Sequence, residues 1–160
     1  LAAARGGDGP GIEPLRRQVA AVSRRLGRRL KILVGKPGLD GHSNGAEQIA
    51  LRARDCGMEV VYQGIRLTPR QIAKAAVEES VHLVGLSILS GAHAALVGDV
   101  IERLAAEGGP AVPVVVGGII PPEDERALLA HGVKRVFTPK DYDLGQVMAE
   151  LVRVIDQSWA

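Results

Sequence analysis

From residue 30 onward, five short apolar runs alternate with five longer stretches in which apolar residues recur every three or four positions. Several of the short runs are continuous in Val, Ile and Leu, which is typical of strands in a parallel sheet whose two faces are both covered. The longer stretches have the period of amphipathic helices. The pattern predicts strands at residues 31–34, 59–62, 83–86, 112–116 and 135–137, and helices at residues 44–56, 69–79, 93–106, 122–130 and 144–156.

Proline and glycine mark the ends of these predicted elements. Prolines stand where two of the helices should begin, and Gly57, Gly108 and Gly132 stand where helices should end. Five strand–helix units of this length predict an α/β fold. We expect a flavodoxin-like (Rossmann-like), doubly wound sheet of five parallel strands in the order 2-1-3-4-5.

The beginning of the chain differs from the rest. Residues 1–12 are rich in Gly, Ala and Pro and predict a tail or linker. Residues 13–26 place apolar residues at helical spacing among four arginines, which predicts a basic amphipathic helix. That helix either lies on the domain or connects it to another one, or it binds a membrane surface or an acidic partner. We expect residues 1–29 to be linker and helix, and residues 30–160 to form the α/β domain that binds the ligand.

Composition excludes several classes of protein. With 46% hydrophobic, 24% charged and only 2% aromatic residues, the chain is typical of a globular domain with an aliphatic core. The formal charge of +2 and the missing nucleic-acid-binding signatures argue against a nucleic-acid partner. Cys56 is the only cysteine, which excludes internal disulfides and thiolate metal clusters. No apolar run approaches the roughly 18 residues of a membrane span and no secretory signal is visible, so we expect no membrane partner and a cytoplasmic location.

The glycine-rich segment between the first predicted strand and helix holds the strongest candidate chemistry. Residues 34–45 read VGKPGLDGHSNG, and four glycines with one proline in so short a span predict a loop. Asp40 and His42 lie two residues apart inside it. A carboxylate beside an imidazole can fix which ring nitrogen is free to bind a ligand or a metal.

Unusual residues also follow the other strands, at the sheet edge where ligands bind in doubly wound folds. Residues 87–93 (SILSGAH) follow the third strand, Gly117-Gly118 the fourth, and residues 138–142 (TPKDY) the fifth. Two of these sets have a structural alternative. The two glycines could form a tight turn, and Ser87 and Ser90 could cap a helix.

The remaining histidines and motifs add little chemistry. His82 and His131 are predicted to be surface or helix-cap residues, and the role of His93 stays open. A phosphorelay receiver needs clustered acidic residues that are missing here, and a flavin site needs aromatic stacking partners, for which the few aromatic residues, Phe137 among them, are not placed. The GxGxxG and Walker A motifs are absent.

Three short motifs, in this order, resemble those of cobalamin-binding domains. Asp40-Gly-His42-Ser-Asn-Gly45 matches their Asp-x-His-x-x-Gly signature, Ser87-Ile-Leu89 their Ser-x-Leu motif, and Gly117-Gly118 their Gly-Gly motif. Over residues 30 to 156 the chain resembles the C-terminal domain or small subunit of adenosylcobalamin-dependent acyl-CoA mutases, the methylmalonyl- and ethylmalonyl-CoA mutase family. Its sequence is most similar to those of the ethylmalonyl-CoA mutases.

The resemblance implies a role for each matching residue. His42 would be the lower axial ligand of cobalt in place of the dimethylbenzimidazole base (base-off, His-on), held by Asp40 with Lys36 nearby. The displaced nucleotide tail would enter the sheet beside the first and third strands, where small side chains leave room. The implied cofactor-binding residues are Lys36, Asp40, Gly41, His42, Gly45, Ser87, Leu89, Gly91, Gly117, Gly118, Thr138 and Pro139.

The implied enzyme is an isomerase that rearranges the carbon skeleton of an acyl-CoA by a radical route, with adenosylcobalamin as its cofactor. Substrate binding would belong to a separate TIM-barrel domain or large subunit, through which the chain could also oligomerise. Because the sequence begins at Leu1 rather than Met, we expect a fragment or processed chain that lacks this partner and is inactive alone. Two alternatives stay open: a corrinoid protein of a methyltransferase system, and a non-catalytic cobalamin-binding partner or sensor.

Overall fold

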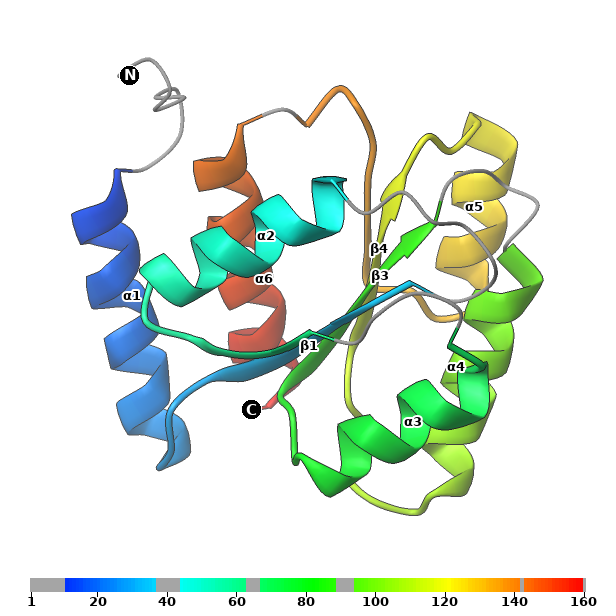
Figure 1. Cartoon of the computed structure of the whole chain (residues 1–160), viewed down its shortest axis with the longest axis horizontal. Coiled ribbons are helices and arrows are strands. Elements are labelled where there is room, and N and C mark those ends of the chain that lie inside the picture. The colour runs from blue at the N-terminus through cyan, green and yellow to red at the C-terminus, as the bar shows by residue number, and fades with distance from the viewer. Residues whose placement is uncertain (1–10, 37–43, 63–66, 89–93, 142, 160) are drawn as a thin grey trace.

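The computed structural model describes residues 11–36, 44–62, 67–88, 94–141 and 143–159, which form one parallel sheet with helices on both faces (Figure 1). The strands are β1 (Lys31–Gly35), β2 (Glu59–Tyr62), β3 (Leu83–Ile88), β4 (Val114–Gly118) and β5 (Arg135–Phe137). The helices are α1 (Ile12–Leu26), α2 (Asn44–Asp55), α3 (Pro69–Glu78), α4 (Ala94–Ala106), α5 (Pro122–Ala130) and α6 (Leu144–Ser158). The strand order is β2-β1-β3-β4-β5, so the predicted flavodoxin-like fold is confirmed.

Two hydrophobic cores, one on each face of the sheet, hold the helices in place. Helices α1, α2 and α6 pack on one face over Ile32, Val34 and Val115. Helices α3, α4 and α5 pack on the other face over Leu33 and Val116. Figure 1 shows the first set at the left and the second at the right. Neighbouring strand residues serve different cores because side chains alternate between the two faces of a strand.

The carboxyl ends of β3 and β4 extend further than the sequence predicts. Ser87 pairs with Gly117, and the next pair of the ladder ends in Gly118. The tight turn at the two glycines and the helix cap at Ser87 are therefore wrong, because all three are strand residues; Ser90 lies outside the described residues. At its other end β4 begins two residues later than predicted, after Pro113, whose missing N–H prevents it from donating to the ladder.

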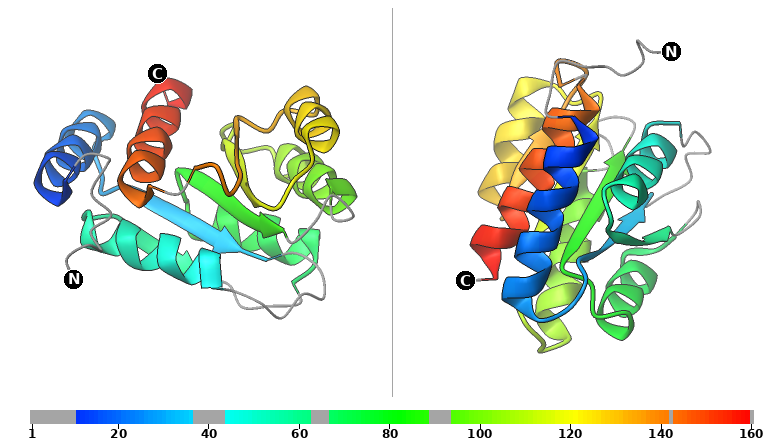
Figure 2. Two further views of the ribbon diagram at one scale, coloured as in Figure 1. Left: turned by 90° about the horizontal axis from the view of Figure 1, so that it is seen from above. Right: turned by 90° about the vertical axis from the view of Figure 1, so that its left-hand side faces the viewer.

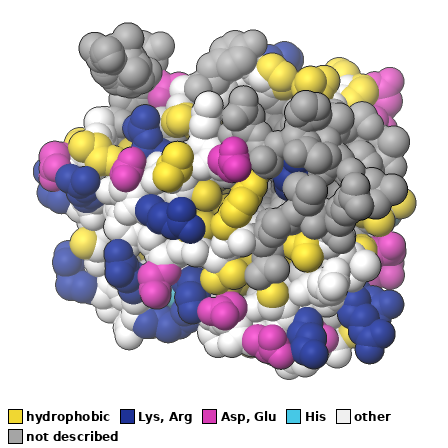
Figure 3. Space-filling model, viewed as in Figure 1, with side chains coloured by type: hydrophobic (Ala, Val, Ile, Leu, Met, Phe, Trp, Pro, Cys, Tyr) yellow, Lys and Arg dark blue, Asp and Glu magenta, His cyan; other side chains and the backbone are white. Residues whose placement is uncertain are grey.

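Helix α1 lies against α6 and shares a hydrophobic core with it (Figure 2). Leu15, Val19 and Val22 face inward and are at most 7% exposed. The arginines of α1 are exposed, and basic side chains gather at the left of Figure 3, where this helix lies. Arg25 forks onto the carboxylate of Asp156 in α6, with N–O distances of 2.6 and 2.9 Å. Packing and ion pairing both fasten α1 to α6.

His82 is buried, which contradicts the prediction of a surface or cap residue. Its side chain is 1% exposed, and its Nδ1 accepts a hydrogen bond from the backbone N–H of Lys31 at 3.1 Å. Its ring meets the indole ring of Trp159 edge to face, with 5.3 Å between centroids. The prediction failed because Trp159 reaches His82 only once α6 has folded onto the sheet. His131 is the exposed C-cap of α5, with Nδ1 2.8 Å from the carbonyl oxygen of Ala127, as predicted.

The ends of three helices lie where their glycines predict. Gly57, Gly108 and Gly132 follow α2, α4 and α5 with φ angles of 100°, 79° and 109°, in the left-handed region that ends a helix. Within the described ranges, none of the helices combines the length and the apolar character needed to cross a membrane.

Candidate functional site

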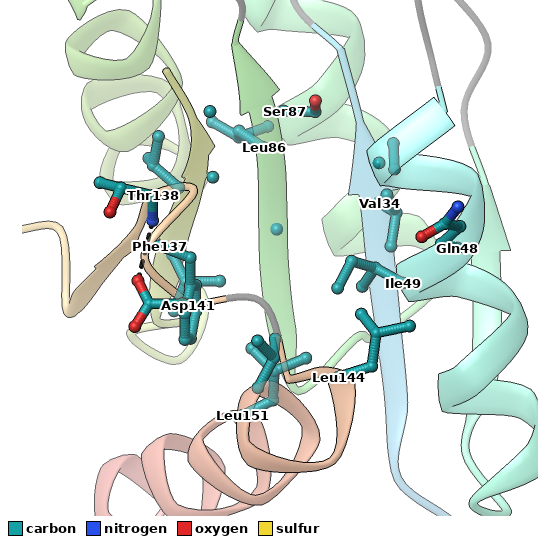
Figure 4. A pocket seen from close by; sticks show the side chains of 18 of the residues that line it. Val34, Gln48, Ile49, Leu86, Ser87, Phe137, Thr138, Asp141, Leu144 and Leu151 are labelled. Carbon is teal, nitrogen blue, oxygen red and sulfur yellow. Dashed lines mark hydrogen bonds between the residues drawn. The ribbon is translucent and has the colours of Figure 1, made fainter. Parts of the chain in front are cut away.

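A cavity of about 330 Å³ lies over β1, β3 and β4, between α2 and α6, and reaches the carboxyl ends of these strands (Figure 4). Ile49 of α2 stands on one side, and Leu144 and Leu151 of α6 stand on another. Phe137 at the end of β5 and Thr138 just after it form a third wall. The cavity therefore opens at the edge where doubly wound sheets bind their ligands.

The structure brings half of the predicted cofactor-binding residues together in this cavity. Those that line it are Gly45, Ser87, Gly117, Gly118, Thr138 and Pro139. Lys36 directly follows β1 and is 1% exposed, but it is not part of the lining. The others lie outside the described residues: Asp40, Gly41, His42, Leu89 and Gly91. Among the residues that are described, no three His, Cys, Asp or Glu side chains gather as a metal site.

Glycines keep the cavity and its strand edges free of side chains. A Cβ atom on Gly118 would stand 1.8 Å from the carbonyl oxygen of Ile88, so β3 and β4 can approach here only with glycine at this position. A Cβ on Gly117 would meet nothing closer than 3.9 Å, and one on Gly45 nothing within 4 Å. At Gly45 and Gly117 the space that a side chain would take is left open beside the cavity.

The remaining lining is mainly aliphatic. Its polar side chains are Gln48, Ser87, Thr138 and Asp141. Asp141 closes a turn, because its Oδ2 accepts a hydrogen bond from the N–H of Thr138 at 2.9 Å and its own N–H donates to the carbonyl oxygen of Thr138 at 2.8 Å (Figure 4). An apolar hollow with a few fixed polar groups suits a mainly apolar ligand that is held in one orientation.

Sequence reasoning missed several lining residues. Phe137 lines the cavity, although its place in the sequence did not predict a residue for ligand stacking. Ile49, Val147 and Leu151 come from α2 and α6. Their apolar spacing does place them on the inner faces of these helices, but spacing cannot distinguish a side chain that packs in the core from one that lines a cavity.

Comparison with known families finds a match over most of the chain. The family model described as the B12 binding domain matches residues 30–146, which is most of the chain. The match runs from the start of β1 to the first turn of α6 and includes each segment that carries a predicted cofactor-binding residue.

Relatives of known name are larger proteins. Ethylmalonyl-CoA mutase of Cereibacter sphaeroides is 56% identical over 148 residues, which are 92% of this chain and 22% of that protein. Mitochondrial methylmalonyl-CoA mutase of Homo sapiens is 42% identical over 123 residues, which are 77% of this chain and 16% of that protein. The chain thus spans about a fifth of the length of the curated relatives it matches.

A solved structure shares the fold. The crystal structure of a cobalamin-binding protein from Desulfitobacterium hafniense superposes with a TM-score of 0.67 and 22% sequence identity, covering 90% of this chain and 71% of that one. At this identity the likeness supports the fold alone.

Proposed function

Because the chain belongs to the B12-binding domain family, we propose that it is the cobalamin-binding part of an adenosylcobalamin-dependent acyl-CoA mutase of the ethylmalonyl- and methylmalonyl-CoA mutase type. A corrinoid protein of a methyltransferase system and a non-catalytic partner or sensor have less support. The relatives that match most of the chain are mutases.

The cavity over β1, β3 and β4 is the observation that carries this proposal. A nucleotide tail displaced from cobalt needs a channel that runs into the protein and ends in an apolar chamber for the benzimidazole ring. The glycines at 45 and 117 leave such space free at the mouth, while Leu83, Val115 and Leu151 line the cavity with aliphatic groups. The residues present therefore fit the cofactor.

The side of the site that faces cobalt is assigned from the family motif. His42 would bind the cobalt, and Asp40 would accept a hydrogen bond from its second imidazole nitrogen and so fix the tautomer. Lys36, buried directly after β1, lies at the entry to the segment that carries both residues. Leu89 and Gly91 would contact the cofactor from the segment after β3.

Adenosylcobalamin, when bound, supplies the weak cobalt–carbon bond that makes radical rearrangement possible. This chain would hold the lower face of the cofactor, orient its axial ligand and enclose its tail. The acyl-CoA would bind to a partner TIM-barrel domain or large subunit, in keeping with the 22% of the relative's length that this chain spans. We therefore expect no acyl-CoA turnover by the chain alone.

An absorption titration tests the proposal directly. The chain, the variant His42→Ala and the matched control His131→Ala, which alters an exposed histidine at the end of α5, are each titrated with hydroxocobalamin and adenosylcobalamin. We expect saturable binding with a His-dependent spectral change for the parent and for His131→Ala. His42→Ala should bind about tenfold or more weakly and lack that change, since even the partners of metal ligands contribute tenfold or more to affinity.

The outcomes separate the parts of the proposal. Absence of binding by the parent would contradict cobalamin binding by this chain. Binding that is equal in the parent and His42→Ala would leave the cavity as the binding site and remove the axial role from His42.

A further inference from the structure

A cluster of charged side chains lies behind the third wall of the cavity, centred on Arg135 of β5. Arg135 and Phe137 are two residues apart in the strand and therefore project from the same face. The guanidinium carbon of Arg135 lies 4.7 Å from the centre of the Phe137 ring. Arg135 thus covers the back of an aromatic ring that lines the cavity.

One backbone carbonyl and two carboxylates hold the guanidinium in this place, and Arg135 donates to the carbonyl oxygen of Val136 at 2.7 Å. Arg135 pairs with Asp141 at 3.7 Å and with Glu150 of α6 at 3.5 Å, and all three side chains are about a third exposed or less. Arg153 also donates to Glu150, at 2.6 Å. The hydrogen bond and the charge of Arg153, with a smaller contribution from the charge of Arg135, lower the pKa of Glu150 below its usual range, so this anchor stays charged.

The carboxylate that Arg135 holds is the one that closes the turn after β5. Asp141 accepts the hydrogen bond of the Thr138 N–H, and both Thr138 and Asp141 line the cavity. At the other end, Glu150 is adjacent in sequence to Leu151, which lines the cavity from α6. Arg135 therefore connects two walls of the cavity that come from different elements.

The Phe137 part of this wall packs against the hydrophobic core, but the wall also borders open space. A second cavity of about 260 Å³ lies behind it, lined in part by Arg135, Phe137, Asp141 and Glu150. On the side of this second cavity, the polar contacts of Arg135 with Asp141 and Glu150 hold the wall.

We propose that Arg135 is a positioning residue for the cofactor tail: by bridging Asp141 and Glu150 behind Phe137, it sets the width of the cavity. The inference rests on the proposed function, because it takes the nucleotide tail of cobalamin as the occupant. It predicts that Arg135 contributes to the affinity for a corrinoid with a nucleotide tail and does not contribute to the affinity for one without the tail.

The test compares hydroxocobalamin with the corresponding cobinamide, which has the same corrin but no nucleotide tail. The variants are Arg135→Met, Arg135→Lys and the control Arg153→Met, which removes the outer partner of Glu150 and a hydrogen bond to Gln157 but keeps Arg135. For Arg135→Met we expect the dissociation constant for cobalamin to rise about tenfold and that for cobinamide to change less than about twofold. Arg135→Lys keeps the charge but loses the planar fork, so it should give an intermediate rise of about threefold.

Each outcome has a defined meaning. Selective weakening of cobalamin by Arg135→Met, with Arg153→Met unchanged for both ligands, supports the inference. An equal loss of affinity for both ligands, or no loss for either, overturns it. If Arg135→Met fails to fold, the same comparison is made with Arg135→Lys. A parent chain that binds neither corrinoid would instead overturn the proposed function itself.

Discussion

The amino ends and the carboxyl ends of the parallel strands, which we call the amino edge and the carboxyl edge of the sheet, are built in opposite ways. At the amino edge, segments far apart in sequence are fastened by short polar contacts: Lys31 pairs with Glu79 at 3.0 Å, and the indole N–H of Trp159 donates to the carbonyl oxygen of His82 at 2.8 Å. At the carboxyl edge, glycines and short side chains leave a cavity open between α2 and α6. Polar contacts tie distant segments together at the amino edge, and the open space at the carboxyl edge can accommodate a ligand.

Gly118→Ala should give the largest effect, because it pushes β3 and β4 apart at the carboxyl edge and so changes both the stability of the fold and the shape of the cavity. The added Cβ would stand 1.8 Å from the carbonyl oxygen of Ile88, at a φ of 156° that side chains rarely adopt. Separating β3 from β4 there should lower the free energy of unfolding by about 3 kcal/mol and weaken cobalamin binding. Urea denaturation of the variant and the parent measures the first effect.

The control for this substitution is Gly98→Ala in α4, where an added Cβ meets nothing within 4 Å. Alanine there should stabilise the chain by about 0.5 to 1 kcal/mol, because it favours the helix. If Gly118→Ala unfolds at the same urea concentration as the parent, the glycine is not required by the approach of the two strands.

The pH dependence of stability tests the amino edge. Burial, and secondarily the nearby charge of Arg28, lowers the pKa of His82 from 6.5 to about 4. Between about pH 6.5 and pH 4, His82 is protonated in the unfolded chain but neutral in the folded chain. The free energy of unfolding therefore falls as the pH falls from about 6.5 to about 4. The shift corresponds to a loss of about 3 kcal/mol over that window.

Urea titrations at pH 7 and pH 4.5 measure this loss. In His82→Asn, whose amide oxygen can still accept from the Lys31 N–H, the decline between the two pH values should be smaller than in the parent. His131→Asn, at an exposed helix end, should keep the full decline. If the free energy of unfolding falls equally between pH 7 and pH 4.5 in the parent and in His82→Asn, His82 does not contribute to the acid sensitivity of the fold.

The contrast between the edges also explains what the sequence could predict of the fold. The strand order follows from local βα units, each of which is legible from its own apolar run and helical period. The carboxyl end of β4 was misplaced because Gly117 and Gly118 indicate a turn on their own, and only pairing with β3 makes them strand residues. His82 was placed at the surface because its cover, Trp159, is 77 residues away in sequence.

The site was predictable to the extent that its residues are unusual. Gly45 stands at the start of α2, and Ser87 and Thr138 stand at the carboxyl ends of strands; the rule that ligands bind at this edge brings them together. Phe137 and Val147 look like ordinary core residues in the sequence. That they line a cavity depends on how far α6 stands from the sheet, which no local pattern encodes.

Gly117→Ala sharpens the comparison at the carboxyl edge alone. The added methyl group meets only Phe137, at 3.9 Å, so the fold should accept it with a change in unfolding free energy within about 0.5 kcal/mol. The methyl group takes space beside the cavity, and the affinity for hydroxocobalamin should fall about fivefold, or about 1 kcal/mol. The titration is run beside Gly98→Ala, which should leave affinity unchanged; a stable Gly117→Ala variant with unchanged affinity would mean that the tail does not pass this residue.

Arg25→Met should give the smallest effect and the clearest separation of the edges. Arg25 donates to the carboxylate and the carbonyl oxygen of Asp156 and to the carbonyl oxygen of Trp159, at the end of α6. Because the Arg25 and Asp156 side chains are 42% and 49% exposed, the ion pair is largely screened by water, and its loss should cost about 0.5 to 1 kcal/mol at low salt and less at high salt.

Arg17→Met is the matched control, since Arg17 is exposed on the same helix and, within the part of the chain that the structure describes, its side chain has no hydrogen bond or ion pair. Neither variant should change the affinity for cobalamin, because neither arginine lines the cavity and the contacts of Arg25 are with the end of α6, at the amino edge. If Arg25→Met weakens cobalamin binding as strongly as it lowers stability, movement of α6 couples the two edges. In that case the amino edge would also control the width of the cavity through Leu144 and Leu151 on the same helix.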